Sequence, residues 1–166
     1  VITPEEQAKI VVLMNQTNLN HEGGDAKHYG QSWGSGFPLE HPMFAPIIAR
    51  LTPQVEQVFG LELEPSGLYA RIYRNGGYLG AHVDRDDLQY TASACIVEPE
   101  KPWFLFVEGD EATQGAPYAI NIGALDAAVM NGTQKRHWRD TLNCDDDDMG
   151  MYVFFHWKKR EPKPSV

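Results

Sequence analysis

One segment of the chain carries two residues of types that commonly bind metals, a histidine and an aspartate separated by one residue. His82 and Asp84 end the segment from Tyr73 to Asp84, in which Gly76 and Gly77 predict a turn. Side chains two residues apart on a strand point to the same side, so this imidazole and carboxylate face one interior. The segment offers two metal ligands, and a third has to come from elsewhere.

His137 is the best candidate for the third ligand. Two histidines and one carboxylate on one face of a metal, with the other positions open, are the ligand set of non-haem Fe(II) oxygenases. A histidine binds metal in its neutral form, so metal affinity is expected to fall on acidification. The pair alone is weakly specific, and its competing interpretation is a surface turn with a solvated Asp84 and with His82 packed on Tyr78.

Two helical segments precede this chemistry. Thr3 is placed to cap a helix that begins at Pro4 and ends near 18–20. A second helical segment runs from Pro42 to Phe59, with a predicted interruption at Thr52-Pro53, where a new N-cap is expected.

Strands dominate the rest of the chain. Residues 21–40, rich in Gly, His and Ser, are predicted to form a loop with a short strand near Tyr29. After Leu61, short aromatic and β-branched segments alternate with turn residues, which favours an antiparallel sandwich or barrel. The predicted strands are Gly67–Tyr73, Ala92–Val97, Trp103–Val107, Tyr118–Ile122, Ala127–Met130 and Met151–Trp157.

Composition limits the class of protein. The chain has 166 residues and a formal charge of −9, which favours one domain and disfavours a protein that binds nucleic-acid phosphates. We expect an α+β, mainly β domain over 1–166, with helices and loops in 1–60, the β core in 61–158 and a tail at 159–166. No apolar run approaches the roughly 18 residues of a membrane span. Two cysteines, Cys95 and Cys144, exclude a disulfide scaffold and indicate a cytoplasmic protein.

The segment that ends at Asp84 resembles the 2-oxoglutarate/Fe(II)-dependent dioxygenases, and more narrowly their prolyl-hydroxylase-like group. The motif of that group is Tyr-x-x-Gly-x-x-Tyr/Leu-x-x-His-x-Asp. It is matched without a gap by Tyr73, Gly76, Leu79, His82 and Asp84. Three later blocks resemble the closing strands of the family: Gly123–Gly132, His137–Arg139 and Phe154–Trp157.

The resemblance covers about residues 61–158 and has consequences for fold and activity. It implies a double-stranded β-helix core, of the jelly-roll or cupin-like kind, with the N-terminal helices packed on it. It also implies Fe(II) held by His82, Asp84 and His137, with 2-oxoglutarate and O2 as co-substrates. The implied reaction is hydroxylation of a C–H bond in an amino acid, a peptide side chain or a small metabolite.

Such an enzyme needs a buried cation for the distal carboxylate of 2-oxoglutarate. The family usually places a Lys or Arg on the final strand, where this chain has Tyr152. Three replacements are ranked Arg139, then Arg71, then Lys158. Tyr73 and Tyr152 are expected to add hydroxyl groups to the same carboxylate.

Two other functions stay open. An AlkB-type nucleic-acid demethylase has a run similar to His82–Asp87, although the net charge disfavours it. A non-catalytic jelly-roll module, with a structural metal or none, is favoured by the missing final-strand cation. If Arg139 points outward, only Arg71 remains as a good anchor. The sequence leaves the oligomeric state open.

Other residues receive less specific predictions. His156 is expected to be a hydrogen-bonded core histidine rather than a fourth ligand. The loops at 21–40 and 85–91 are expected to shape the substrate entrance, where His28 and Trp33 are candidates.

Overall fold

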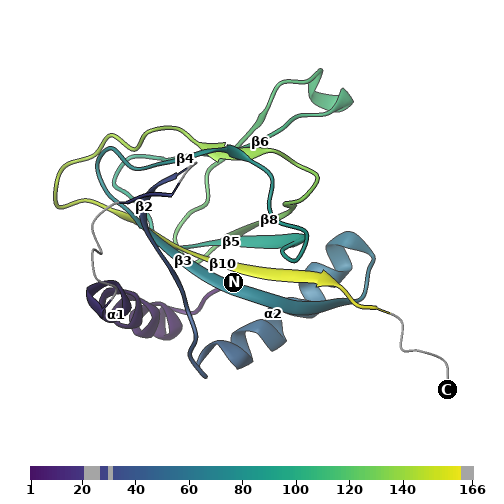
Figure 1. The fold of residues 1–166 in the computed structure, drawn as a ribbon, viewed down its shortest axis with the longest axis horizontal. Helices are drawn as coiled ribbons and strands as arrows, with labels where there is room; N and C mark the ends of the chain where they lie inside the picture. Colours follow the sequence, from purple (N-terminus) through teal and green to yellow (C-terminus); the bar gives the residue numbers. More distant parts are fainter. Residues whose placement is uncertain (21–26, 30–31, 162–166) are drawn as a thin grey trace.

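The computed structural model describes residues 1–20, 27–29 and 32–161 of the chain. Two helices, α1 (Pro4–Asn20) and α2 (Phe44–Phe59), lie on one side of the strands (Figure 1). The strands are β1 (Lys27–Tyr29), β2 (Ser32–Pro38), β3 (Leu63–Tyr73), β4 (Tyr78–His82), β5 (Tyr90–Val97), β6 (Leu105–Val107), β7 (Tyr118–Ile120), β8 (Ala127–Asn131), β9 (His137–Arg139) and β10 (Gly150–Lys159). A short 3-10 helix spans Glu111–Thr113.

The strands form an antiparallel sheet that folds over at β2. Their order is β7-β6-β9-β4-β2-β3-β10-β5-β8, and β1 pairs with β2. The first part of β2 pairs with β4, and residues Ser35–Pro38 pair with β3. The two halves of the sheet therefore face each other and enclose an interior (Figure 1).

The first helix begins as predicted. The Thr3 backbone N–H donates to Glu6 Oε2 at 2.9 Å, and the Glu6 N–H donates to Thr3 Oγ1 at 3.2 Å. This reciprocal pair satisfies two backbone donors at the end of α1.

The predicted interruption of the second helix is wrong. α2 is continuous through Pro53 and ends at Gly60, whose φ of +66° is left-handed. Thr52 does not cap a new helix, because its hydroxyl donates to the Ile48 carbonyl at 2.8 Å and accepts from Trp157 Nε1 at 2.9 Å. Burial on the sheet outweighs the cost of a proline inside the helix.

The loop predicted over 21–40 is corrected for Ser32–Pro38, which form β2. A segment rich in glycine and serine has no apolar alternation to reveal a strand. Its backbone nevertheless pairs with β3 and β4, so tertiary pairing decides its structure. Residues 21–26 and 30–31 lie outside the described part.

The central strands are buried on both faces. On β5, Ala92, Ala94 and Ile96 pack toward the helices, whereas the alternate residues face the enclosed interior. Apolar side chains from both helices complete the outer core: Ile10, Met14, Phe44, Ile47, Leu51 and Val55. At roughly 2 kcal/mol for each buried aliphatic side chain, this helix–sheet core holds the strands in place and lets their inner face carry polar residues. Neither helix of the described part is long and apolar enough to cross a membrane.

Candidate metal centre and adjoining cavity

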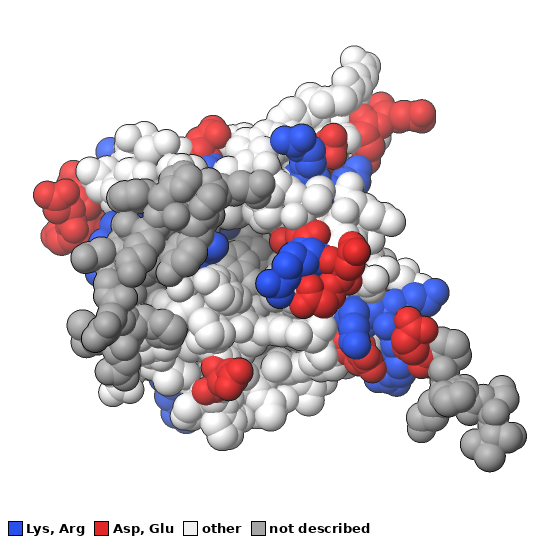
Figure 2. Space-filling view, in the orientation of Figure 1, with Lys and Arg blue, Asp and Glu red and all other residues white. Residues whose placement is uncertain are grey.

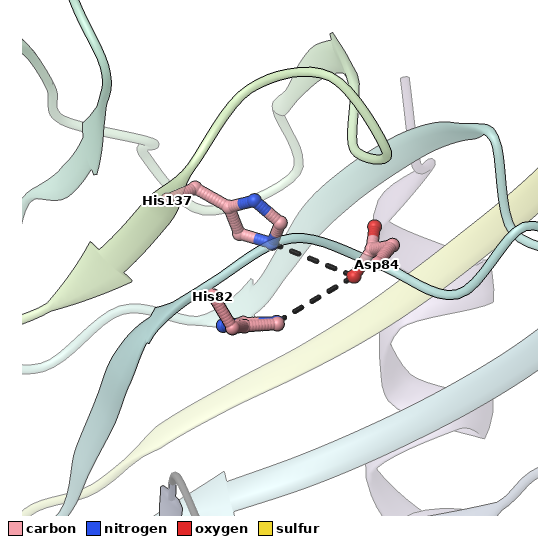
Figure 3. A group of neighbouring side chains, drawn as sticks. All are labelled: His82, Asp84 and His137. Atoms are coloured by element: carbon pink, nitrogen blue, oxygen red, sulfur yellow. Dashed lines mark ion pairs between the residues drawn. The ribbon is translucent and has the colours of Figure 1, made fainter.

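The three predicted ligands meet at one point (Figure 3). His82 ends β4 and pairs in register with His137 of β9, and Asp84 follows two residues after His82. The Nε2 atoms of His82 and His137 lie 3.5 and 3.6 Å from Asp84 Oδ1. One ligand atom from each residue lies within 4.8 Å of the others. Two imidazole nitrogens and one carboxylate oxygen are a donor set that suits Fe(II).

Backbone carbonyls set the proton positions of both histidines. His82 Nδ1 lies 2.8 Å from the Gly80 carbonyl oxygen, and His137 Nδ1 lies 3.0 Å from that of Lys135. A carbonyl oxygen only accepts, so each Nδ1 carries the proton that it donates. In the neutral rings Nε2 then bears a free lone pair. Both rings are therefore arranged to bind a metal through Nε2.

The Asp84 carboxylate is also held in place. Its Oδ2 accepts from Thr91 Oγ1 at 2.8 Å, and its backbone N–H donates to the Gly132 carbonyl at 2.8 Å. A Cβ at Gly132 would collide with Asp84 Oδ2, so only glycine leaves room for this carboxylate. The other carboxylate oxygen, Oδ1, faces the Nε2 atoms of His82 and His137.

A buried histidine continues this network. His156 Nδ1 lies 3.0 Å from Thr91 Oγ1, and both side chains are buried. His156 is hydrogen-bonded, as expected, and its ring lines the same cavity as the ligands. No sequence motif indicated a role for Thr91. Alternation along β5 could have indicated one, since Thr91, Ser93 and Cys95 share the inward face.

Burial and the carboxylate set the charge of the site. Burial lowers the pKa of His137, and it lowers the pKa of His156 to about 4. At His82 burial also acts downward, but the Asp84 hydrogen bond and charge outweigh it and raise the pKa. Burial opposes ionisation of Asp84, yet hydrogen bonds from His82 and Thr91 and the charge of His137 keep its pKa low. Near neutral pH the carboxylate of Asp84 is ionised and the rings of His137 and His156 are neutral, whereas His82 holds its proton to higher pH than they do.

A cavity of about 1150 Å³ contains all three ligands. Its wall includes Ser93, Phe154 and Tyr69, and it reaches Arg71 on β3. Arg85 and Asp87, which form an exposed ion pair at 3.1 Å, also belong to the lining. Of the described residues, Arg139 is not part of this lining. The side chains of His28 and Trp33, the candidates for the substrate entrance, lie outside the described part of the structure.

Arg71 brings a cation into this cavity. Its guanidinium carbon lies 5.5 Å from the centre of the Tyr69 ring. Its Nη1 is buried, and no described residue accepts a hydrogen bond from it. A buried donor without an acceptor costs about 1–3 kcal/mol, and more when charged.

Arg139 points inward and is 2% exposed. Its Nη1 donates to the Trp103 carbonyl at 2.7 Å, and its guanidinium carbon lies 4.8 and 4.2 Å from the ring centres of Trp103 and Tyr152. Within the described structure, neither Arg139 Nη2 nor the fully buried Tyr73 hydroxyl has a hydrogen-bond partner. Burial raises the pKa of Tyr73 although Arg71 and Arg139 act against it, so its hydroxyl keeps its proton.

The remaining anchor candidates lie elsewhere or are engaged. Lys158 is exposed and pairs with Glu64 at 3.0 Å. Burial raises the pKa of Tyr152, so its hydroxyl stays protonated, and its ring packs against the Arg139 guanidinium. The structure therefore gathers three donors that lack an acceptor among the described residues: Arg71 Nη1, Arg139 Nη2 and Tyr73 Oη.

The sequence and the fold were compared with those of known proteins, and only the fold has matches. The sequence matches no protein-family profile and no curated protein. Among solved structures, a prolyl-4-hydroxylase of Pseudomonas putida matches with a TM-score of 0.69 and 11% identity, over 96% of this chain and 90% of the other. The α-ketoglutarate-dependent carbocyclase SnoK of nogalamycin biosynthesis matches with a TM-score of 0.68 and 13% identity, over 99% and 81%.

A third match has ligands bound. HygX from Streptomyces hygroscopicus, with nickel and 2-oxoglutarate, matches with a TM-score of 0.62 and 13% identity, over 96% of this chain and 80% of the other. At such low identity these likenesses show the fold alone. They confirm the double-stranded β-helix with N-terminal helices, and they agree with the resemblance to the prolyl-hydroxylase-like group.

Proposed function

We propose that the protein is an Fe(II)- and 2-oxoglutarate-dependent dioxygenase. The observation that carries this proposal is the pairing of two sites in one cavity. His82, Asp84 and His137 direct their free ligand atoms to one point, and the wall of the same cavity includes Arg71, whose Nη1 has no hydrogen-bond acceptor among the described residues. A metal-chelating dicarboxylate is complementary to both sites.

Each residue has a defined part in the proposed reaction. His82, Asp84 and His137 hold Fe(II) and leave its other positions accessible from the cavity. With 2-oxoglutarate and O2, iron supplies the oxidising chemistry that attacks a C–H bond. The protein holds the metal, orients the co-substrate and places the substrate beside them.

The donors without an acceptor define the proposed anchor of 2-oxoglutarate. Arg71 is favoured as the first donor to its distal carboxylate, because Arg71 lines the cavity and Arg139 does not. This reverses the order given from the sequence, in which Arg139 came first. Arg139 Nη2 and the Tyr73 hydroxyl are proposed as further donors. Charge-assisted hydrogen bonds of this kind are about twice as strong as neutral ones.

The proposed substrate is an amino acid, a peptide side chain or a small metabolite, and the proposed outcome is hydroxylation. The cavity is large enough for 2-oxoglutarate and a small substrate together. The charge distribution does not favour a nucleic-acid demethylase, because acidic and basic side chains adjoin each other on the face in Figure 2. Lys158 and Arg160 pair with Glu64 and Glu62. The inward Arg139 and the cavity-lining Arg71 argue against a non-catalytic module.

We also propose a cytoplasmic location, because Cys95 and Cys144 are both free thiols and a reducing compartment keeps them so.

Anaerobic titration with Fe(II) and then 2-oxoglutarate tests the proposal. We expect a visible charge-transfer band that needs both components, followed by succinate formation when O2 and a substrate are added. Mass spectrometry of candidate amino acids, peptides and oligonucleotides would detect the added oxygen. Absence of the band, with zinc retained tightly instead, would overturn the proposal in favour of a binding module.

A further inference from the structure

The hydrogen-bond chain behind the metal site runs through three side chains on three segments. Asp84 Oδ2, Thr91 Oγ1 and His156 Nδ1 are joined by contacts of 2.8 and 3.0 Å. Thr91 lies on β5, and His156 lies opposite it on β10, where the two residues pair in register. The chain therefore connects the Asp84 loop to two neighbouring strands of the buried sheet.

The proton positions in this chain follow from its chemistry. A carboxylate only accepts, so the hydroxyl of Thr91 gives its single proton to Asp84. The same hydroxyl then has only lone pairs for His156. Nδ1 of His156 must therefore carry a proton and donate it to Thr91 Oγ1, because two lone pairs at 3.0 Å would repel each other.

The packing around the carboxylate leaves it little freedom. Gly132 borders Oδ2 closely, and the Asp84 backbone is bonded to the Gly132 carbonyl. The Thr91 hydroxyl is the donor that fixes the rotation of the carboxylate about its side-chain axis. His156 fixes that hydroxyl in turn, because its N–H occupies one of the two lone pairs.

We propose that His156 is a positioning residue for the metal site, acting through Thr91. It sets the direction of the Thr91 hydroxyl, which holds Asp84 Oδ1 toward the Nε2 atoms of both histidines. The inference rests on the proposed function, since it assumes that these three residues bind a divalent metal. It assigns two residues, Thr91 and His156, that do not contact the metal.

Metal affinity without turnover is the suitable measurement. Co(II) alone is titrated into the full-length metal-free chain, and its visible ligand-field absorption gives the dissociation constant. Outer hydrogen bonds of this kind are typically worth 10- to 100-fold in metal affinity. Thr91→Val and His156→Leu are each expected to weaken Co(II) binding by about 10-fold or more.

Conservative variants separate the hydrogen bond from packing. Thr91→Ser keeps the hydroxyl, and His156→Asn keeps an N–H donor near the position of Nδ1. Both are expected to bind Co(II) within about 3-fold of the unchanged protein. Val153→Ala, on the opposite face of β10, is the matched control: it lowers the thermal midpoint but leaves Co(II) affinity unchanged.

The double variant tests whether His156 acts through Thr91. If it does, His156→Leu adds less than about 2-fold to the loss already caused by Thr91→Val. If the two single losses of Co(II) affinity multiply in the double variant, His156 does not act through Thr91. Unchanged Co(II) affinity in both single variants would also overturn the proposal. If His156→Leu does not fold, the Thr91→Val and Thr91→Ser pair and the His156→Asn variant decide the matter.

Co(II) binding by the unchanged protein distinguishes failure of this inference from failure of the proposed function. If it binds Co(II) and the variants bind equally well, only this inference fails. If it binds no Co(II), the proposed function and the inference fail together.

Discussion

Two regions of the interior differ in how their polar atoms are partnered: the histidine end of the cavity, and an arginine end where Arg71 lines the cavity while Arg139 and Tyr73 lie outside its lining. At the histidine end, both Nδ1 atoms and Asp84 Oδ2 have partners, and only the three atoms that face one another remain available. At the arginine end, donors on Arg71, Arg139 and Tyr73 find no acceptor among the described residues. The first end is arranged for a cation and the second for an anion. The difference indicates a ligand that chelates a metal at one end and carries a negative charge at the other.

Removing the shared carboxylate should have the largest effect. Asp84→Ala takes away the oxygen that faces both histidines, so metal binding and succinate formation should fall to background. Iron content after desalting and succinate yield measure the two losses. Asp87→Ala is the control, since this exposed carboxylate of the same loop pairs with Arg85 and should leave the iron content unchanged. Normal turnover in Asp84→Ala would refute the ligand assignment.

Removing the arginine charge should affect the other end alone. Arg71→Met is expected to weaken 2-oxoglutarate binding by roughly 100-fold, because a buried charge pair loses one partner. Co(II) affinity should stay the same. The 2-oxoglutarate concentration that gives half of the charge-transfer band measures the effect.

Arg139→Met sharpens the assignment of the anchor. It should weaken 2-oxoglutarate binding less than Arg71→Met and should lower stability more, because Arg139 packs between Trp103 and Tyr152. A larger loss of 2-oxoglutarate affinity in Arg139→Met would restore the order given from the sequence.

Acid should destabilise the metal-free protein through the histidine end. His156 stays neutral in the folded state down to a pKa of about 4, whereas the unfolded chain takes up this proton near 6.5. The unfolded state therefore binds more protons between these values, and stability is lost as the pH falls. The contribution of His156 is roughly 2 kcal/mol between pH 6.5 and about 4.5. The raised pKa of His82 has the opposite effect, because protonation of this residue stabilises the folded state as the pH falls.

Urea unfolding of the metal-free protein at both pH values measures the acid effect. His156→Asn removes the titrating group, so this variant should lose about 2 kcal/mol less than the unchanged protein. An equal acid loss in both proteins would show that His156 is not the group responsible.

The smallest expected effect is a loss of stability from a substitution at the start of α1, outside both the histidine end and the arginine end. Thr3→Ala removes the N-cap of α1 and should cost about 1 kcal/mol of stability, again measured by urea unfolding. Affinities for Co(II) and 2-oxoglutarate should not change. A change in either would mean that general destabilisation reaches the cavity, and it would weaken the interpretation of the other variants.

Local patterns predicted part of this structure well. The capping residues at Thr3 and Glu6 act within one turn, so the sequence gives the start of α1 directly. Runs of aromatic and β-branched residues between turn residues placed Met151–Trp157 and Ala92–Val97 close to the observed β10 and β5. β2 was missed, because its pairing with β3 and β4 comes from distant segments. The continuity of α2 through Pro53 was missed for a similar reason, since Trp157 holds Thr52 from the far end of the chain.

By itself the sequence determined the spacing of His82 and Asp84, the resemblance carried by that motif, and the mainly β class of the fold. These depend on neighbouring residues and on the two-residue period of a strand. Only the tertiary structure decided that His137 lies beside them, that Arg71 and not Arg139 lines their cavity, and that Thr91 and His156 stand behind Asp84. The physical reason is that strand register and the folding of the sheet over β2 fix which inward side chains meet, and no local pattern contains that information.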